Sequence, residues 1–171
     1  SLESPVIGYT LGDQAGIGPE VIHAALQHVP QGAEYKLIGK AITCTAGCPT
    51  QDTAKAALEH LEQAAAALKS GEIDAVVTAP ICKEALHRIG FHYPGQTEFF
   101  ADRMGVKDFA MCLTGKHLTV VLCTTHKAIA EVPQLLRTEE IVRVATLLTR
   151  FLQRTGTPTP RLALAGLNPH N

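Results

Sequence analysis

The stretch PVIGYTLGDQAGIGPEVIHAAL, residues 5–26, decides the fold class, because it passes from a strand pattern through a glycine-rich loop into a helix pattern. Residues 5–11 form an apolar run of strand length. Pro19 stands where the first turn of a helix tolerates a missing N–H, and apolar side chains then repeat on one face over residues 21–29. The stretch therefore predicts a strand–loop–helix unit, the repeating element of α/β proteins.

The same alternation continues along the chain. Further strands are predicted at 35–39, 73–80 and 161–167, and further helices at 52–69, 83–89, 97–104 and 138–152, the last with Thr138 as its cap. Residues 108–126 contain two β-rich runs, which predict an antiparallel hairpin with Gly115 and Lys116 as a two-residue turn. We expect an α/β fold with a mostly parallel, helix-covered sheet and one antiparallel hairpin.

Composition excludes several classes of protein. Apolar residues make up 46% of the 171 residues, charged residues 18%, and the formal net charge is −1. No apolar run approaches the roughly 18 residues that cross a bilayer, and no basic stripe indicates nucleic acid. Five cysteines, which include an isolated C-x3-C pair at Cys44 and Cys48, favour reduced thiols and not a zinc site. We expect a soluble, cytoplasmic protein that binds neither membranes nor nucleic acid.

Candidate functional residues directly follow the predicted strands. Ligands of open α/β sheets bind beyond the carboxyl ends of the strands. The residues found there are Asp13, Lys83, His126 and His170. We expect them at one edge of the sheet, although they are far apart in the sequence.

The two histidines of this set have two interpretations. Imidazoles suit divalent metals, and a catalytic metal site needs about three protein ligands, of which His126 and His170 provide two. Taken alone, the two side chains favour simple hydrogen bonding to loop carbonyls by about two to one. The histidines on predicted helices, His60 among them, are expected at solvated or boundary positions without a functional role.

The other candidate residues can also be explained by a purely structural role. The loop at residues 12–18 lacks the third glycine of a dinucleotide fingerprint, because Val21 occupies that position. Its glycines either present N–H groups to an anion or form a tight turn. Lys83 either neutralises an anionic substrate or is solvated, and Thr97 with Glu98 can simply start a helix.

Taken together, five blocks of sequence resemble one family. The blocks are GDQAGIGPEV (12–21), VVTAPICKEAL (76–86), PGQTEFFADRMG (94–105), LCTTHKAI (122–129) and GLNPHN (166–171). In this order they resemble the 4-hydroxythreonine-4-phosphate dehydrogenase family of vitamin B6 biosynthesis, and the resemblance runs from about Pro5 to Asn171.

The resemblance implies a homodimeric, isopropylmalate-dehydrogenase-like enzyme. Such an enzyme oxidises 4-phosphohydroxy-L-threonine with NAD or NADP, and the resulting keto acid loses carbon dioxide. It implies a divalent metal (Zn, Mg or Co) held by three histidines, two of them at His126 and His170. The third would lie in a later segment of the partner subunit. Residues 1–171 would then be a single α/β segment of a longer two-domain enzyme.

Two departures from the family pattern bear on the substrate. The family motif G-H-T-E, whose histidine and threonine contact substrate, is here Gly95-Gln96-Thr97-Glu98, so Gln96 and Thr97 are the predicted substrate-binding residues. The stretch 40–50 is also shorter than in the family. A related enzyme of another hydroxy acid or of a cis-dihydrodiol, such as that of terephthalate, is therefore an alternative. A non-catalytic metal- or small-ligand-binding module is a third. No residue is assigned a catalytic role.

Overall fold

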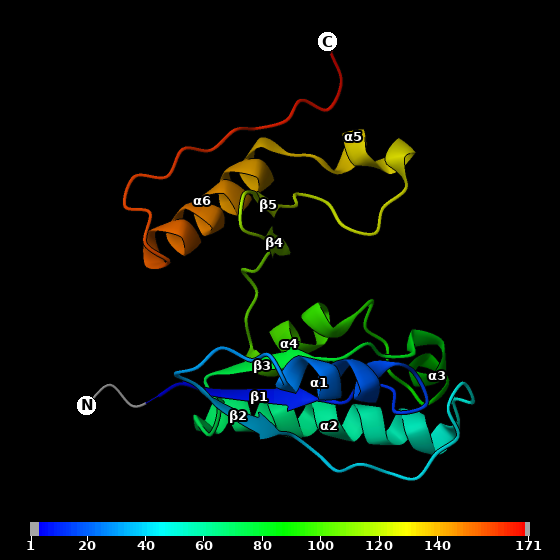
Figure 1. The fold of residues 1–171 in the computed structure, drawn as a ribbon. Helices are drawn as coiled ribbons and strands as arrows, with labels where there is room; N and C mark the ends of the chain where they lie inside the picture. The colour runs from blue at the N-terminus through cyan, green and yellow to red at the C-terminus, as the bar shows by residue number, and fades with distance from the viewer. Residues whose placement is uncertain (1–3, 170–171) are drawn as a thin grey trace. The chain divides into compact units, whose positions relative to one another are not determined.

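The computed structural model describes residues 4–169, which form two compact units, one ending at Gly105 and the other beginning at Val106 (Figure 1). Each unit is described by itself. Among the described residues, no helix is both long enough and apolar enough to cross a bilayer. The expectation that residues 1–171 make up one segment of a longer protein stays a prediction.

The first unit is built on a parallel sheet of three strands in the order β2-β1-β3. The strands are β1 (Val6–Thr10), β2 (Glu34–Leu37) and β3 (Ala75–Thr78), and Ile7 lies opposite both Tyr35 and Ala75. Parallel neighbours require long crossover connections. These contain α1 (Gly18–Leu26) and α2 (Gln51–Ser70), so the predicted strand–helix alternation is confirmed.

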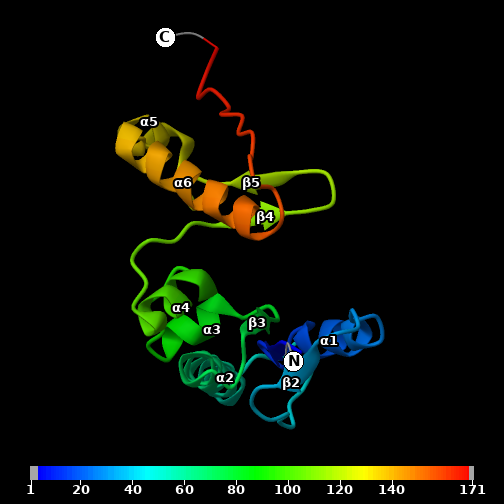
Figure 2. The same ribbon diagram turned by 90° about the vertical axis from the view of Figure 1, so that its left-hand side faces the viewer.

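Helices cover both faces of this sheet (Figure 2). Val6 of β1 and Val76 of β3 pack on one face with residues of α2, including Ala64 and Ala67. Tyr9, on the other face, packs with residues of α1. The alternation of side chains along β1 thus explains why the strand is apolar on both faces.

A second core lies under the helices that follow β3. These are α3 (Lys83–Arg88) and α4 (Gln96–Met104), and both contact α2. Phe99 of α4 is completely buried in a cluster that also contains Phe91 and Leu61. The helices that carry Lys83, Gln96 and Thr97 are therefore held by apolar packing against α2.

His60 corrects one expectation from the sequence. Its ring is buried, with 4% of the residue exposed, and is not at a solvated position. His60 Nε2 accepts a hydrogen bond from the Lys40 N–H at 3.0 Å, just where the chain leaves β2. A Cβ atom on Gly39, whose φ is +90°, would lie 2.0 Å from the ring. The helix pattern could not reveal this because the partner segment is twenty residues away.

The second unit contains a hairpin and helices. Its elements are β4 (Cys112–Thr114), β5 (Thr119–Val121), the 3₁₀ helix η1 (Ile129–Glu131), α5 (Val132–Leu135) and α6 (Thr138–Arg154). The strands are antiparallel, as expected, but Thr114 pairs with Thr119. The predicted two-residue turn is therefore wrong: residues 115–118 form the loop, closed by the Gly115 N–H donating to Leu118 O at 2.9 Å.

Two further predictions in this unit are wrong. Thr138 is the first residue of α6 and not its cap; Arg137 holds the cap position, and its side chain makes no capping hydrogen bond. Residues 161–166 form no strand. A strand requires a neighbour with which to exchange backbone hydrogen bonds, and none of the strands between residues 4 and 169 pairs with this segment.

Candidate functional site

The glycine-rich loop after β1 approaches its own chain. Gly12 has a φ of +65°, and a Cβ atom on it would lie 2.1 Å from the carbonyl oxygen of Pro80. The N–H of Asp13 donates to that same oxygen at 2.9 Å. Glycine is therefore needed for a left-handed turn that packs against the end of β3, which favours the tight-turn interpretation over anion binding.

Asp13 is buried and serves this loop. The Ala15 N–H donates to Asp13 Oδ1 at 3.0 Å. The side chain of the next residue, Gln14, makes two hydrogen bonds to the backbone beyond β2. Its Nε2 donates to Lys40 O at 3.1 Å, and its Oε1 accepts from the Ile42 N–H at 2.8 Å. Sequence reasoning missed Gln14, because nothing local marks a side chain that satisfies a distant loop.

Lys83 and Thr97 lie at the exposed starts of two helices. A Cβ atom placed on Gly95, the cap residue of α4, would lie 3.8 Å from Lys83 Nζ and 3.4 Å from Glu98 Oε2. The ammonium group therefore reaches the N-terminus of α4, where no side chain caps the backbone N–H groups. A lysine beside uncapped N–H groups attracts an anion, although the Glu98 carboxylate partly offsets that charge.

Gln96 connects this helix start to the sheet. Its Nε2 donates to Ala79 O at 3.2 Å, directly after β3. Its Oε1 is buried and has no hydrogen-bond partner among the described residues. Asp13 is hydrogen-bonded to Pro80, and Gln96 is hydrogen-bonded to Ala79. The structure therefore brings the predicted residues of the first unit to one edge, beyond β1 and β3: Asp13, Lys83, Gln96 and Thr97. Their binding roles stay predictions.

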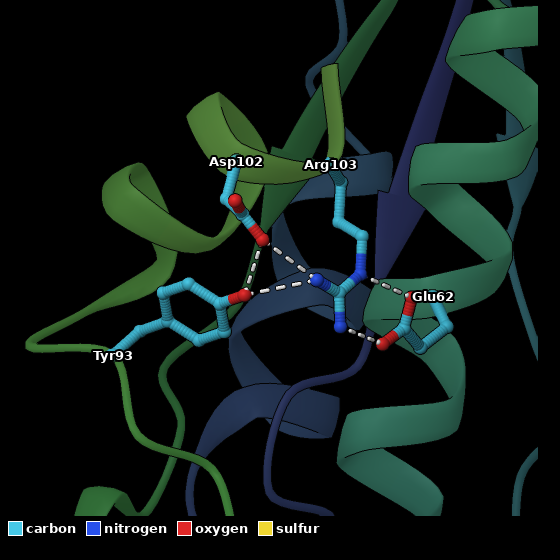
Figure 3. Close-up of polar contacts among 4 residues, drawn as sticks. All are labelled: Glu62, Tyr93, Asp102 and Arg103. Carbon is cyan, nitrogen blue, oxygen red and sulfur yellow. Dashed lines mark hydrogen bonds and ion pairs between the residues drawn. The ribbon is translucent and has the colours of Figure 1, made fainter. Parts of the chain in front are cut away.

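A polar cluster at the other end of α4 was not foreseen (Figure 3). Arg103 Nε and Nη2 donate to the two carboxylate oxygens of Glu62 at 2.8 and 2.6 Å. Arg103 Nη1 donates to the Tyr93 hydroxyl and to Asp102 Oδ2, both at 2.9 Å. The hydrogen bonds from Arg103 hold the pKa of Glu62 below its usual value, and donation to Asp102 raises the pKa of Tyr93.

His126 belongs to the second unit and has an unusual backbone. Its φ of +56° is the only left-handed value of a non-glycine residue among the described residues. Such strained conformations cluster at functional sites. Its side chain is exposed and available as a ligand. His170, the second predicted ligand, lies outside the described residues, so whether the two rings meet stays a prediction.

Metal binding by this chain would need donors beyond the described residues. Within residues 4–169, no three histidine, cysteine or acidic side chains gather in a way that could hold a metal ion. The exposed imidazole of His126 suits a divalent metal, but one such ligand does not make a site. The donor set is therefore compatible with a metal only if His170 and a further group complete it.

Comparison with known proteins identifies a family. Residues 14–171 match the family described as pyridoxal phosphate biosynthetic protein PdxA. The chain is 31% identical to a 4-hydroxythreonine-4-phosphate dehydrogenase of Trichlorobacter lovleyi, with 97% of this chain and 63% of the relative covered. It is 29% identical to a putative D-threonate 4-phosphate dehydrogenase of Oceanobacillus iheyensis, with 98% and 64% covered.

Solved structures agree with this result. A putative 4-hydroxythreonine-4-phosphate dehydrogenase of Salmonella typhimurium matches with a TM-score of 0.85 at 29% identity, over 98% of this chain and 65% of the other. A terephthalate 1,2-cis-dihydrodiol dehydrogenase of Burkholderia xenovorans matches with a TM-score of 0.61 at 25% identity, over 91% and 59%. The predicted α/β fold class is thereby confirmed.

The chain spans a little under two thirds of the length of the curated relatives it matches. It also differs from them internally. The alignment with the Trichlorobacter relative runs over 212 residues, whereas this chain has 171, so at least 41 residues of the relative have no counterpart here. That the stretch 40–50 is the shortened part stays a prediction.

Proposed function

This chain belongs to the PdxA family of pyridoxal phosphate biosynthetic proteins, and from that premise we propose that the full-length protein is a metal- and NAD(P)-dependent dehydrogenase of 4-phosphohydroxy-L-threonine. The observation that carries the proposal is the family match, which includes every candidate site residue except Asp13. The names of the relatives, dehydrogenases of phosphorylated hydroxy acids among them, support the reaction class. Residues 1–171 would be one α/β segment of this enzyme.

The residues of the first unit would bind and orient the substrate. Lys83 and the uncapped N-terminus of α4 offer positive charge to an anionic group, and the exposed Thr97 hydroxyl can donate or accept a hydrogen bond. Gln96 holds this helix start on the end of β3 through Ala79. The role of these groups is positioning, which can supply a large part of a rate enhancement.

His126 and His170 would be two of the metal ligands, and a third would come from the partner subunit of a homodimer. A bound divalent cation would lower the pKa of the substrate hydroxyl while the carbon that carries this hydroxyl gives its hydride to the nicotinamide, and would withdraw electrons during decarboxylation. The left-handed backbone at His126 supports its assignment, because strain of this kind is retained where function requires it. Zn, Mg and Co, and NAD and NADP, are all compatible with this proposal.

The protein would work in the cytoplasm as a homodimer on a small-molecule substrate, without nucleic acid or membrane. All five cysteines are free thiols in the structure.

The test is a nicotinamide-absorbance assay of the full-length protein with and without a chelator. We expect NAD(P) reduction with 4-phosphohydroxy-L-threonine that the chelator abolishes. His126→Ala should lose both bound metal, measured by elemental analysis, and turnover. His117→Ala is the matched control, because His117, in the hairpin loop, is exposed like His126 but is no predicted ligand. Normal metal content in His126→Ala would remove His126 from the ligand set.

Gln96 supports a second candidate substrate. Its amide stands where the family has an imidazole, and it cannot carry a proton at neutral pH. The same assay should therefore include D-threonate 4-phosphate and the cis-dihydrodiol of terephthalate, which the names of two relatives suggest. If Gln96 marks a changed substrate, Gln96→His should raise turnover of 4-phosphohydroxy-L-threonine; equal or lower turnover contradicts this reasoning. No turnover of any compound would favour a non-catalytic binding module.

A further inference from the structure

We propose that Arg103 is a positioning residue that fixes the Gly95–Thr97 turn, the predicted substrate-binding turn, from the opposite end of α4. The inference rests on the proposed function for its consequence, but its geometry is independent of it. Arg103 lies in the last turn of α4, whereas Gln96 and Thr97 begin that helix. It therefore acts at a distance and would not touch substrate.

The guanidinium connects three separate pieces of chain. Two of its nitrogens form a fork with the Glu62 carboxylate on α2 at 2.8 and 2.6 Å. Its third nitrogen donates to the hydroxyl of Tyr93 at 2.9 Å, in the loop that leads to the turn (Figure 3). The Tyr93 hydroxyl in turn donates to Asp102. A fork of this kind specifies direction as well as distance, because both hydrogen bonds are planar and parallel.

Aromatic packing makes the arrangement rigid. The guanidinium carbon lies 4.8 Å from the ring centre of Phe99, which is completely buried. The ring of Tyr93 meets Phe99 edge-on at 5.5 Å and an angle of 90°. Tyr93 is therefore fixed by its ring and by its hydroxyl, and only Pro94 separates it from Gly95.

The turn is thus held from both sides. On one side Tyr93 is bound to Arg103, and on the other the amide of Gln96 is bound to Ala79 at the end of β3. Gly95 itself has no side chain and its helix start has no side-chain cap. The position of the uncapped N–H groups therefore depends on these two attachments together with the burial of Phe99.

Stability alone does not account for the cluster. Arg103 and Glu62 remain 34% and 43% exposed, and ion pairs at such exposure add little to stability. Small displacements of a substrate-binding group, in contrast, lower kcat/KM strongly. An arrangement of four coordinated side chains at this exposure is better explained by the precision it gives to the turn.

The chain provides a matched control in its second unit. Arg143 forms the same fork with Glu140 and also donates to Asp108 Oδ1 at 2.7 Å. Its exposure of 33%, with 35% for Glu140, is nearly that of the Arg103 pair. The helix that carries Arg143, α6, contains no predicted substrate-binding residue. Replacing either arginine by lysine keeps the charge and removes the fork.

The first experiment compares Arg103→Lys with Arg143→Lys in the full-length protein, at a temperature where both are folded by circular dichroism. We expect Arg103→Lys to raise KM for the hydroxy acid about tenfold, with kcat and KM for NAD(P) within about twofold of wild type. Arg143→Lys should leave all three constants unchanged. Equal effects of the two variants, or a loss confined to kcat, would overturn the proposal.

The second experiment measures hydrogen exchange and needs no activity. In Arg103→Lys, the amide of Phe99, whose N–H donates to Gly95 O at 3.4 Å, should exchange about tenfold faster than in wild type, while Arg143→Lys leaves it unchanged. Unchanged exchange in Arg103→Lys would refute the positioning role even if activity fell. If the wild-type protein oxidises no hydroxy acid at all, the proposed function fails, and exchange still decides the role of Arg103.

Discussion

His60 lies beneath the chain as it leaves β2, and its ring occupies the space beside Gly39. Its Nε2 accepts a hydrogen bond from Lys40, so the neutral ring is the form that fits. Burial lowers the pKa of His60, and the nearby Glu59 carboxylate opposes this only in part. His60 is therefore a proton-sensitive contact between α2 and the segment after β2.

This contact predicts a pH dependence of stability. Because the folded pKa lies below the ordinary value near 6.5, the unfolded chain takes up the proton first as the pH falls. The contribution of His60 is complete above pH 6.5 and is lost as the pH falls below it, by at most about 1.4 kcal/mol per pH unit for one proton. Urea unfolding of the 171-residue chain between pH 8 and 5.5 measures this loss.

The variant His60→Gln removes the titrating group and keeps an acceptor for Lys40. It should show a smaller loss of unfolding free energy over that pH range than the wild-type chain. His117→Gln, which removes an exposed histidine, should follow the wild-type curve. Parallel curves for wild type and His60→Gln would show that His60 does not titrate on unfolding.

Individual residues differ in how far sequence could predict them. The position of Asp13 and Lys83 beyond strands followed from strand order, because parallel strands all end at one edge. The hydrogen bonds of Gln14, His60 and Arg103 could not be predicted, since each reaches a segment at least twenty residues away. The backbone strain at His126 also leaves no trace in the local pattern.

At the scale of the element, the two longest helices begin differently. The α2 helix begins with a capping box, in which Thr50 Oγ1 accepts from the Thr53 N–H and Thr53 Oγ1 accepts from the Thr50 N–H. The α6 helix begins after Arg137, which has the extended backbone of a cap residue but no side-chain acceptor. The first N–H groups of α6 therefore lack a side-chain partner among the described residues.

This difference predicts a stabilising substitution. Arg137→Ser should stabilise α6 against local unfolding by about 1 kcal/mol, because a serine at the cap position accepts a hydrogen bond from the first turn. Thr50→Ala should lower the free energy of unfolding of the first unit by a similar amount. Hydrogen exchange of the α6 amides measures the first effect, and urea denaturation of the 171-residue chain measures the second. Arg137→Ala is the control, and equal stability of the serine and alanine variants would contradict the capping argument.

Whole elements were easier to predict than their boundaries. Strands and helices of the first unit follow from periodicity, because most of them pack apolar side chains into its core, although β2 leaves Leu37 exposed. The predicted hairpin loop is shorter than the observed one. A two-residue turn with glycine first requires a positive φ, and Gly115 does not have one. Residues 161–167 have a strand pattern, but a pattern alone does not provide the neighbouring strand that pairing needs.

At the scale of the whole molecule, the apolar core is divided unequally. Among the described residues, every buried apolar side chain except Val144 belongs to the first unit. In the second unit, Leu162, Leu164 and Leu167 are 43%, 73% and 55% exposed. By itself, the second unit buries too little apolar surface to offset the conformational entropy that it loses on folding.

The two units should therefore behave differently when separated. Residues 1–105 should unfold cooperatively in urea, followed by circular dichroism, because they contain the sheet and both of its helical layers. Residues 106–171 should show no cooperative transition under the same conditions. A sharp transition of residues 106–171 alone would show that the exposed leucines in this structure are covered in solution.

The segment between Lys40 and Thr50 has a consequence for protein engineering. It is tied at its start by Gln14 and His60, near its middle by the Gly47 N–H, which donates to Ala15 O at 2.7 Å, and at its end by the capping box of α2. Most of its side chains are exposed, and lengthening a loop costs little closure entropy. An epitope or reporter peptide inserted between Cys44 and Thr45 keeps all of these contacts and should leave the strand register intact, and natural chains can gain or lose residues there without refolding their core.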